Sequence, residues 1–319
     1  MERWERVGRF AGYGAALALS PYLLIKVAWV VGSLLGLVPI GEGFSLAGWV
    51  LLNTVTIGMA GIGIALALAL VRPWGMRIPG FLVAFCAWTG AGFLVSILPY
   101  ALLSTVLDAG RGTAADSGGD DPSMPGWEGA LIQFSFIGMG LGLALAVPAY
   151  LRRRWPEAFA RQVGDGTPTV PTRAASVAAG IVGLVWAYWA AGGTLGITRP
   201  AERDINWYLL TSVGALWALA GAAASWTLAW KSPAWVPHRL LLALGWLGSG
   251  SLFAWSGWKL PLTLFVAVAD PADVKLPENP AVAPVLHLAA VVAGVGMVRT
   301  LVRPRTGAQP DTHARVDPG

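Results

Sequence analysis

Charged side chains are scarce in this sequence, and that scarcity excludes an ordinary soluble domain. Only 12% of the 319 residues are charged, whereas 55% are hydrophobic and the mean hydropathy is +0.62. Soluble domains usually carry about 25% charged residues. Long apolar runs account for the deficit, and each is long enough to cross a hydrocarbon layer about 30 Å thick. The composition therefore predicts an all-α integral membrane protein.

Cysteine, histidine and catalytic motifs are also rare. The single cysteine, Cys86, excludes a disulfide framework or a cysteine metal site within one chain. The three histidines lie on different segments and are too few for a di-haem or a histidine zinc site. The sequence contains no HExxH, GxSxG, Walker, paired Asp-rich or CxxC motif. We therefore expect no metal, no cofactor and no covalent chemistry of a common type.

Hydropathy divides the chain into eight predicted membrane spans. The first is too long for the apolar region of a signal peptide, which covers about 7–15 residues, so we interpret it as a membrane helix. The spans cover approximately residues 10–37, 46–71, 80–105, 129–150, 174–198, 206–230, 239–260 and 280–302.

The distribution of basic residues predicts the orientation of these spans. Of the 22 Lys and Arg residues, 16 fall on the side of the two termini, five on the opposite side, and Lys26 within the first span. Positive charge stays on the cytoplasmic side during insertion, so both termini are expected inside the cell. The net charge of +5 then belongs to the membrane surface, and nucleic acid is not expected as a partner.

Four matches in the same order indicate an internal duplication. Trp29 corresponds to Trp189 at an offset of 160 residues, and Trp49 to Trp207 at 158. Each half has four spans, so both would cross in the same direction, which predicts a parallel 4+4 repeat about an axis along the membrane normal. The remaining correspondences are Pro79, Trp88, Gly90 and Gly92 with Pro237, Trp246, Gly248 and Gly250, and Pro99 and Asp108 with Pro261 and Asp270.

The repeat divides the chain into regions. We expect a first four-helix membrane repeat (1–150), a cytoplasmic linker (151–173), a second four-helix repeat (174–302) and a disordered cytoplasmic tail (303–319). Proline 99 and its equivalent at 261 are expected to end or kink their spans. Small-xxx-small glycine pairs predict close approach of helix backbones, and they are Gly32/Gly36, Gly192/Gly196 and Gly138/Gly142.

Lys26 is the most informative single residue, because an ionisable group inside a span costs roughly 2.5–3.5 kcal/mol. Its ammonium should face the bundle interior, toward Asn53, Thr56 or Gln133, since no span contains a carboxylate at similar depth. Two interpretations of Lys26 are equally favoured. In the first it is a cationic anchor for an anionic ligand or for an ion path. In the second it is a structural lysine bonded to carbonyls and polar neighbours.

Three further polar residues are candidates. Asp108 and Asp270, equivalent under the repeat, are placed at an outer vestibule where a carboxylate pair would bind a cation; two turn residues in water are the favoured alternative. His287, in the eighth span, has the chemistry of a proton relay. A neutral histidine bonded to a neighbouring helix is the favoured interpretation.

The Lys-x-x-Trp-x-x-Gly element at Lys26, Trp29 and Gly32, with 18 Arg against 4 Lys, resembles Trp- and Ala-rich multi-pass membrane proteins of GC-rich actinobacteria. That resemblance implies a location in a bacterial cell membrane and does not imply an activity. A buried lysine and a 4+4 repeat favour a transporter or permease for a small molecule. A non-catalytic accessory, assembly or immunity protein, held by a membrane partner or a second copy, is the alternative. An enzyme acting on an apolar substrate ranks third.

Overall fold

The computed structural model describes residues 2–41, 45–110, 126–155, 170–230, 236–269 and 276–302, and these are almost entirely helical. Eight helices are long and apolar enough to cross a membrane, as the hydropathy predicted, so the fold is that of an all-helical, multi-pass membrane protein. They are α1 (Glu2–Leu34), α2 (Leu46–Val71), α3 (Gly80–Gly110), α4 (Gly126–Arg154), α6 (Val170–Ala190), α7 (Ile205–Ala229), α8 (His238–Ala269) and α9 (Val282–Val302), with short 3-10 turns η1 (Pro73–Met76) and η2 (Pro200–Glu202).

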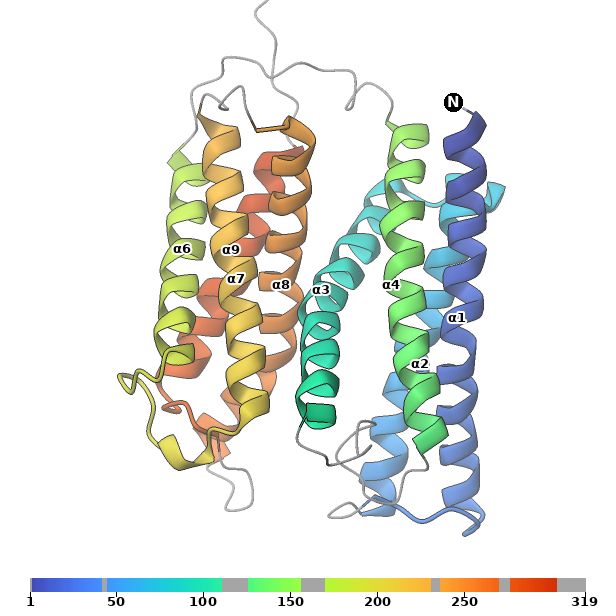
Figure 1. Ribbon diagram of the computed structural model, residues 1–319, viewed down its shortest axis with the longest axis horizontal. Helices are drawn as coiled ribbons and strands as arrows, with labels where there is room; N and C mark the ends of the chain where they lie inside the picture. Colours follow the sequence, from blue (N-terminus) through green and yellow to red (C-terminus); the bar gives the residue numbers. More distant parts are fainter. Residues whose placement is uncertain are drawn as a thin grey trace, which may run out of the picture.

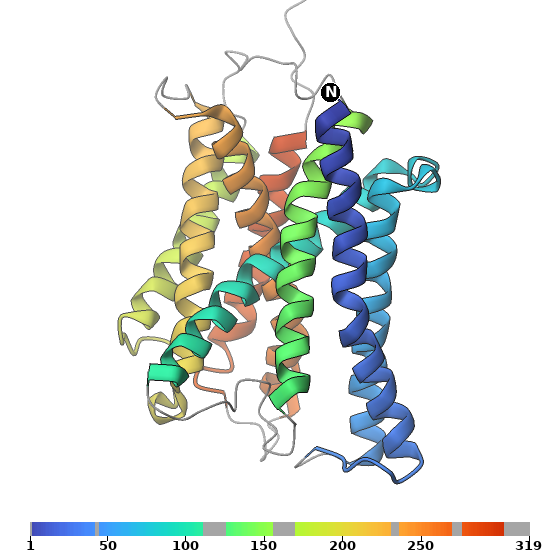
Figure 2. The same cartoon turned by 45° about the vertical axis from the view of Figure 1, so that its right-hand side comes forward.

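The helices form two groups with α3 between them (Figure 1). Helix α1 packs along α2 and α4, whereas α6, α7, α8 and α9 form the second group. Although α3 lies in the first half of the sequence, it packs mainly on α8 and α7, and Figure 2 shows it crossing obliquely in front of the second group. Helix α1 begins and α9 ends at one end of the bundle, the top of Figure 1. We call the opposite end the far end.

Small residues bring α3 and α8 together. A Cβ atom added to Gly92 would overlap the backbone of Gly250, so only glycine permits this approach. Around that contact the Trp88 indole donates a 3.0 Å hydrogen bond to the Ser249 hydroxyl, and the Trp88 ring stacks on Phe253 with centroids 4.7 Å apart. The two halves of the chain are therefore joined by a tight, partly polar helix contact.

The glycine pairs behave differently from one another. Gly138 and Gly142 face alanines of α1 and permit close packing of α4 on that helix, as predicted. The prediction is wrong for Gly36, Gly192 and Gly196, which lie beyond helix ends with φ of +71°, +96° and +82°. Glycine adopts these left-handed conformations more readily than other residues do, so the three glycines turn the chain.

Two helix ends differ from the predicted spans. Helix α6 stops at Ala190 instead of residue 198, because the connection folds back and the Tyr188 hydroxyl accepts hydrogen bonds from the amides of Thr194 and Leu195, at 3.2 and 3.3 Å. Helix α8 continues past Pro261 to Ala269, just as α3 continues past Pro99. Of the two expected effects, an end of the span is therefore wrong at both prolines, and a kink stays a prediction.

Candidate functional site at the far end of the second half

Two connections are tied together at the far end of the second helix group. The amides of Thr198 and Arg199 donate to the carbonyl of Pro277 at 2.9 and 3.1 Å, and the amide of Asn279 donates to the carbonyl of Gly196 at 2.8 Å. Asn279 also caps the start of α9, since its side chain accepts from the amide of Ala281 at 2.9 Å. This pairing fixes the backbone on both sides of Glu278.

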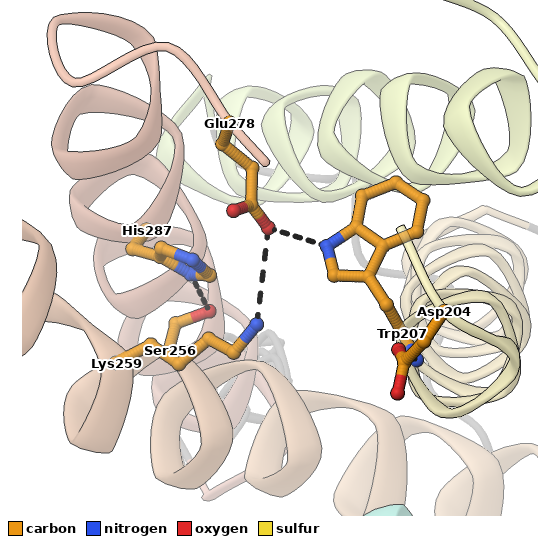
Figure 3. Close-up of polar contacts among 6 residues, drawn as sticks. All are labelled: Asp204, Trp207, Ser256, Lys259, Glu278 and His287. Carbon is orange, nitrogen blue, oxygen red and sulfur yellow. Dashed lines mark hydrogen bonds and ion pairs between the residues drawn. The ribbon is translucent and has the colours of Figure 1, made fainter. Parts of the chain in front are cut away.

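Glu278 points inward from this paired segment (Figure 3), and only 7% of it is exposed. Its Oε1 atom accepts a 2.9 Å hydrogen bond from the indole of Trp207 and lies 3.9 Å from the ammonium of Lys259 on α8. Trp207 is positioned at the start of α7, where its own amide donates to the capping side chain of Asp204 at 2.8 Å. Within the described ranges this is the one recorded salt bridge.

His287 lies on the other side of the same cluster. Its Nδ1 atom is 3.1 Å from the hydroxyl of Ser256, one helical turn before Lys259 on α8. Both side chains are buried, and the imidazole also contacts the Trp186 ring, with centroids 6.0 Å apart. The bond to a neighbouring helix, which a structural histidine requires, is present. Its position beside Lys259 and Glu278 was not foreseen.

Two small cavities meet at Glu278. The first, which is partly open, is lined by Glu278, Lys259 and His287 together with Trp186, Trp189, Leu210, Thr211, Gly214 and Trp255. The second, also partly open, is lined by Glu278 with Thr198, Arg199, Thr263, Val266, Leu276, Pro280 and Ala283. Both are narrow, with room for a water molecule or two. Glu278 therefore lines both cavities, the second of which also includes Thr198 and Arg199 of the paired connections.

The first half holds a second polar cluster, centred on Lys26. The ammonium donates a 3.0 Å hydrogen bond to Oδ1 of Asn53 on α2 and lies over the Trp29 ring, 3.9 Å from its centroid. Asn53 is 1% exposed, and its amide donates to the carbonyl of Trp49 at 2.9 Å. The expected contact between Lys26 and Asn53 is thus present, and Lys26 lines neither cavity.

Two details around Lys26 differ from the prediction. Lys26 is eight residues from the end of α1 and eight from its midpoint, about 12 Å along the helix in either direction, so it lies between the middle of the helix and the far end. A carboxylate is also close: Glu128, in the first turn of α4, accepts a 3.1 Å hydrogen bond from the Trp29 indole and interacts electrostatically with Lys26. The prediction that no acid lies at similar depth is therefore wrong.

The remaining sequence candidates are not brought into either cavity. Gln133 is half-buried on α4, the helix that packs along α1. Asp108 lies in the last turn of α3, and the position of its side chain is not described. Asp270 lies outside the described residues, so the vestibule pair stays a prediction. Over the described ranges, no group of three His, Cys, Asp or Glu residues is placed to hold a metal ion.

Comparison with known proteins does not assign the chain to a family. No protein family, no curated protein and no solved structure matches the chain. Any functional inference therefore rests on the two polar clusters and on the helices that position them.

Sequence reasoning missed most of the site at Glu278. Neither Glu278 nor Lys259 was a candidate, and Trp207 was predicted only as a member of the repeat. One local signal was available: Ser256 and Lys259 are three residues apart, so they lie on one face of a helix that continues past Pro261. The other contacts join residues far apart in the sequence: Ser256 and His287 are separated by 31 residues, and Trp207 and Glu278 by 71, which is beyond any local pattern.

Proposed function

We propose that the chain is a permease-like membrane protein that passes a small polar solute through its second half, with Glu278 dividing the path. One observation carries the proposal: a buried carboxylate borders both cavities and is held by Lys259 and Trp207. Ionisable groups buried among the helices of a membrane protein are costly, and they mark solute or ion paths.

The contact with Lys259 is suited to opening and closing. At 3.9 Å it is long for an ion pair, and a buried pair gains little net stability, because loss of hydration offsets most of the attraction. Glu278 also belongs to the connection between helices and not to a helix itself. Breaking the backbone hydrogen bonds of Pro277 and Asn279 would free residues 276–281 to withdraw the carboxylate and join the two cavities, with no helix having to unfold.

Osmotic swelling of proteoliposomes tests this function. Vesicles containing the purified protein are mixed with urea, glycerol, methylammonium or acetate, and entry is followed by light scattering. We expect at least one solute to enter faster than in protein-free vesicles, and Glu278→Gln to slow that entry about tenfold, a barrier difference of about 1.4 kcal/mol. The matched control is Glu202→Gln, which changes an exposed acid of the facing connection. Entry of every solute at the protein-free rate would reject the proposal.

The α3–α8 contact favours a second candidate, a non-transporting accessory membrane protein. Gly92 meets the backbone of Gly250 so closely that the two helix groups have little freedom to move against each other. A partner protein or a second copy would then bind the outer helix faces. Co-purification of a stoichiometric membrane partner, together with absence of solute entry in the swelling assay, would favour this candidate over the first.

We also propose the parallel duplication, with both termini in the cytoplasm of a bacterial cell. In support, the predicted equivalents Trp29/Trp49 and Trp189/Trp207 are in ring contact within each half, with centroids 5.7 and 6.4 Å apart. The equivalent glycines at 92 and 250 touch each other, as residues on a two-fold axis do. The hydrophobic cores support the division as well, since one is drawn from residues 15–150 and another from residues 175–297.

A further inference from the structure

The cavity beside Glu278 combines a lining of three tryptophans with a buried carboxylate. Trp186, Trp189 and Trp255 all line it. The recorded hydrogen bond and ion pair of Glu278 both involve Oε1, and Figure 3 shows the second oxygen on the side of His287. Aromatic ring faces are electronegative, and a carboxylate accepts hydrogen bonds without donating any. Both features favour a cation that donates hydrogen bonds.

Lys259 already supplies such a cation from within the chain. Its ammonium is 3.9 Å from Glu278 and 5.6 Å from the centroid of the Trp255 ring. The Lys26 cluster repeats this chemistry in the first half, where a lysine ammonium lies 3.9 Å from a tryptophan centroid and a glutamate is close by. Each half thus surrounds an alkylammonium group with an indole face and a carboxylate.

An anion would meet the opposite environment in this cavity. It would approach Lys259, but it would also meet the Glu278 carboxylate, which repels negative charge. The hydroxyl of Thr211 and the ring of His287 are compatible with either sign. The balance of the lining therefore favours a positive ligand that replaces the Lys259 ammonium at Glu278.

We propose that this cavity binds a small primary ammonium ion, which competes with Lys259 for the carboxylate of Glu278. The proposal rests on the function proposed above and names its substrate class. The narrow cavity sets the size: methylammonium, with two heavy atoms, is the appropriate probe, and larger amines require the paired connections to open. Cation–π contact with the tryptophan faces contributes to recognition of the ammonium group.

Binding is measured by saturation-transfer NMR on methylammonium with the full-length protein in detergent, and acetate serves as the anionic probe. We expect saturable binding of methylammonium and none of acetate. Glu278→Gln should weaken binding about tenfold or more, while Glu202→Gln leaves it unchanged. Glu278→Asp, which keeps the charge, should retain binding and so separates loss of the carboxylate from loss of the fold.

The Lys259→Met variant is the most decisive test of the proposed competition. Because the lysine competes with the ligand, its removal should strengthen methylammonium binding several-fold, whereas an anion site would lose its only ammonium and bind nothing. Acetate binding, or weaker methylammonium binding in Lys259→Met, would overturn the proposal. If another solute enters proteoliposomes while methylammonium fails to bind, the ammonium assignment alone is wrong. If methylammonium binds while no solute enters, the transport function alone is wrong.

Discussion

The indole N–H of Trp217 on α7 donates a 2.7 Å hydrogen bond to the carbonyl of Val95 on α3. Pro99 follows four residues after Val95 and has no N–H to offer that carbonyl, so the helix alone would leave it unpaired. Trp217 satisfies it from a neighbouring helix, which is how membrane helices tolerate proline. The same bond attaches α3 to the second helix group.

Trp217→Phe is expected to lower the free energy of unfolding by about 1–3 kcal/mol, because it leaves the partly buried carbonyl of Val95 without a donor. The thermal unfolding midpoint in detergent measures the effect. Trp226→Phe is the matched control, since Trp226 lies on the same helix at the surface. An equal loss in both variants would show that ring size, and not the hydrogen bond, matters.

Gly92→Ala is expected to destabilise the protein by about 1–3 kcal/mol or more, because the added methyl group overlaps the backbone of Gly250 and forces α3 from α8. Gly90→Ala is the control on the same helix: a Cβ atom there meets no neighbour, and alanine favours the helix by about 1 kcal/mol. Thermal midpoints of the two variants should therefore move in opposite directions. A stable Gly92→Ala protein would contradict the tight contact.

Lys26→Met is expected to lower thermal stability by about 1–3 kcal/mol, because Oδ1 of the buried Asn53 loses its donor. Asn53→Leu in the same chain should restore part of the loss, since removing both partners leaves no unpaired group. Solute entry per folded molecule should not change, because Lys26 lines neither cavity. Loss of solute entry in a fully stable Lys26→Met protein would instead make this lysine a working part of the path.

Cysteine-accessibility labelling tests the orientation in a Cys86→Ser background, which removes the chain's single cysteine. Cysteines placed in 111–124 or 271–279 should react with an impermeant reagent from outside intact cells, and cysteines in 155–172 only after lysis. The reason is the excess of basic residues on the side of the termini. Labelling of 155–172 from outside would reverse the proposed orientation.

The sequence by itself determined the number, type and approximate limits of the helices. A span needs about 20 apolar residues, and that requirement is local, so it is legible in a single chain. Local information also limited the partners of Lys26 to Asn53, Thr56 or Gln133, because a buried ammonium needs a polar partner, and the structure selects Asn53. The prediction from sequence was wrong for Gly36, Gly192 and Gly196, because spacing alone does not distinguish a packing residue from a turn residue.

Only the tertiary structure decided where the charges meet. Glu278 is a loop residue in the sequence, and it becomes a buried partner of Trp207 and Lys259 because two connections pair through their backbones and turn it inward. Likewise, α3 packs mainly on helices of the second half, and it contacts α8 closely because glycines on both helices allow their backbones to touch. Such contacts join residues far apart in the chain, and their free energy depends on complementary shape, which no local pattern of hydropathy or charge encodes.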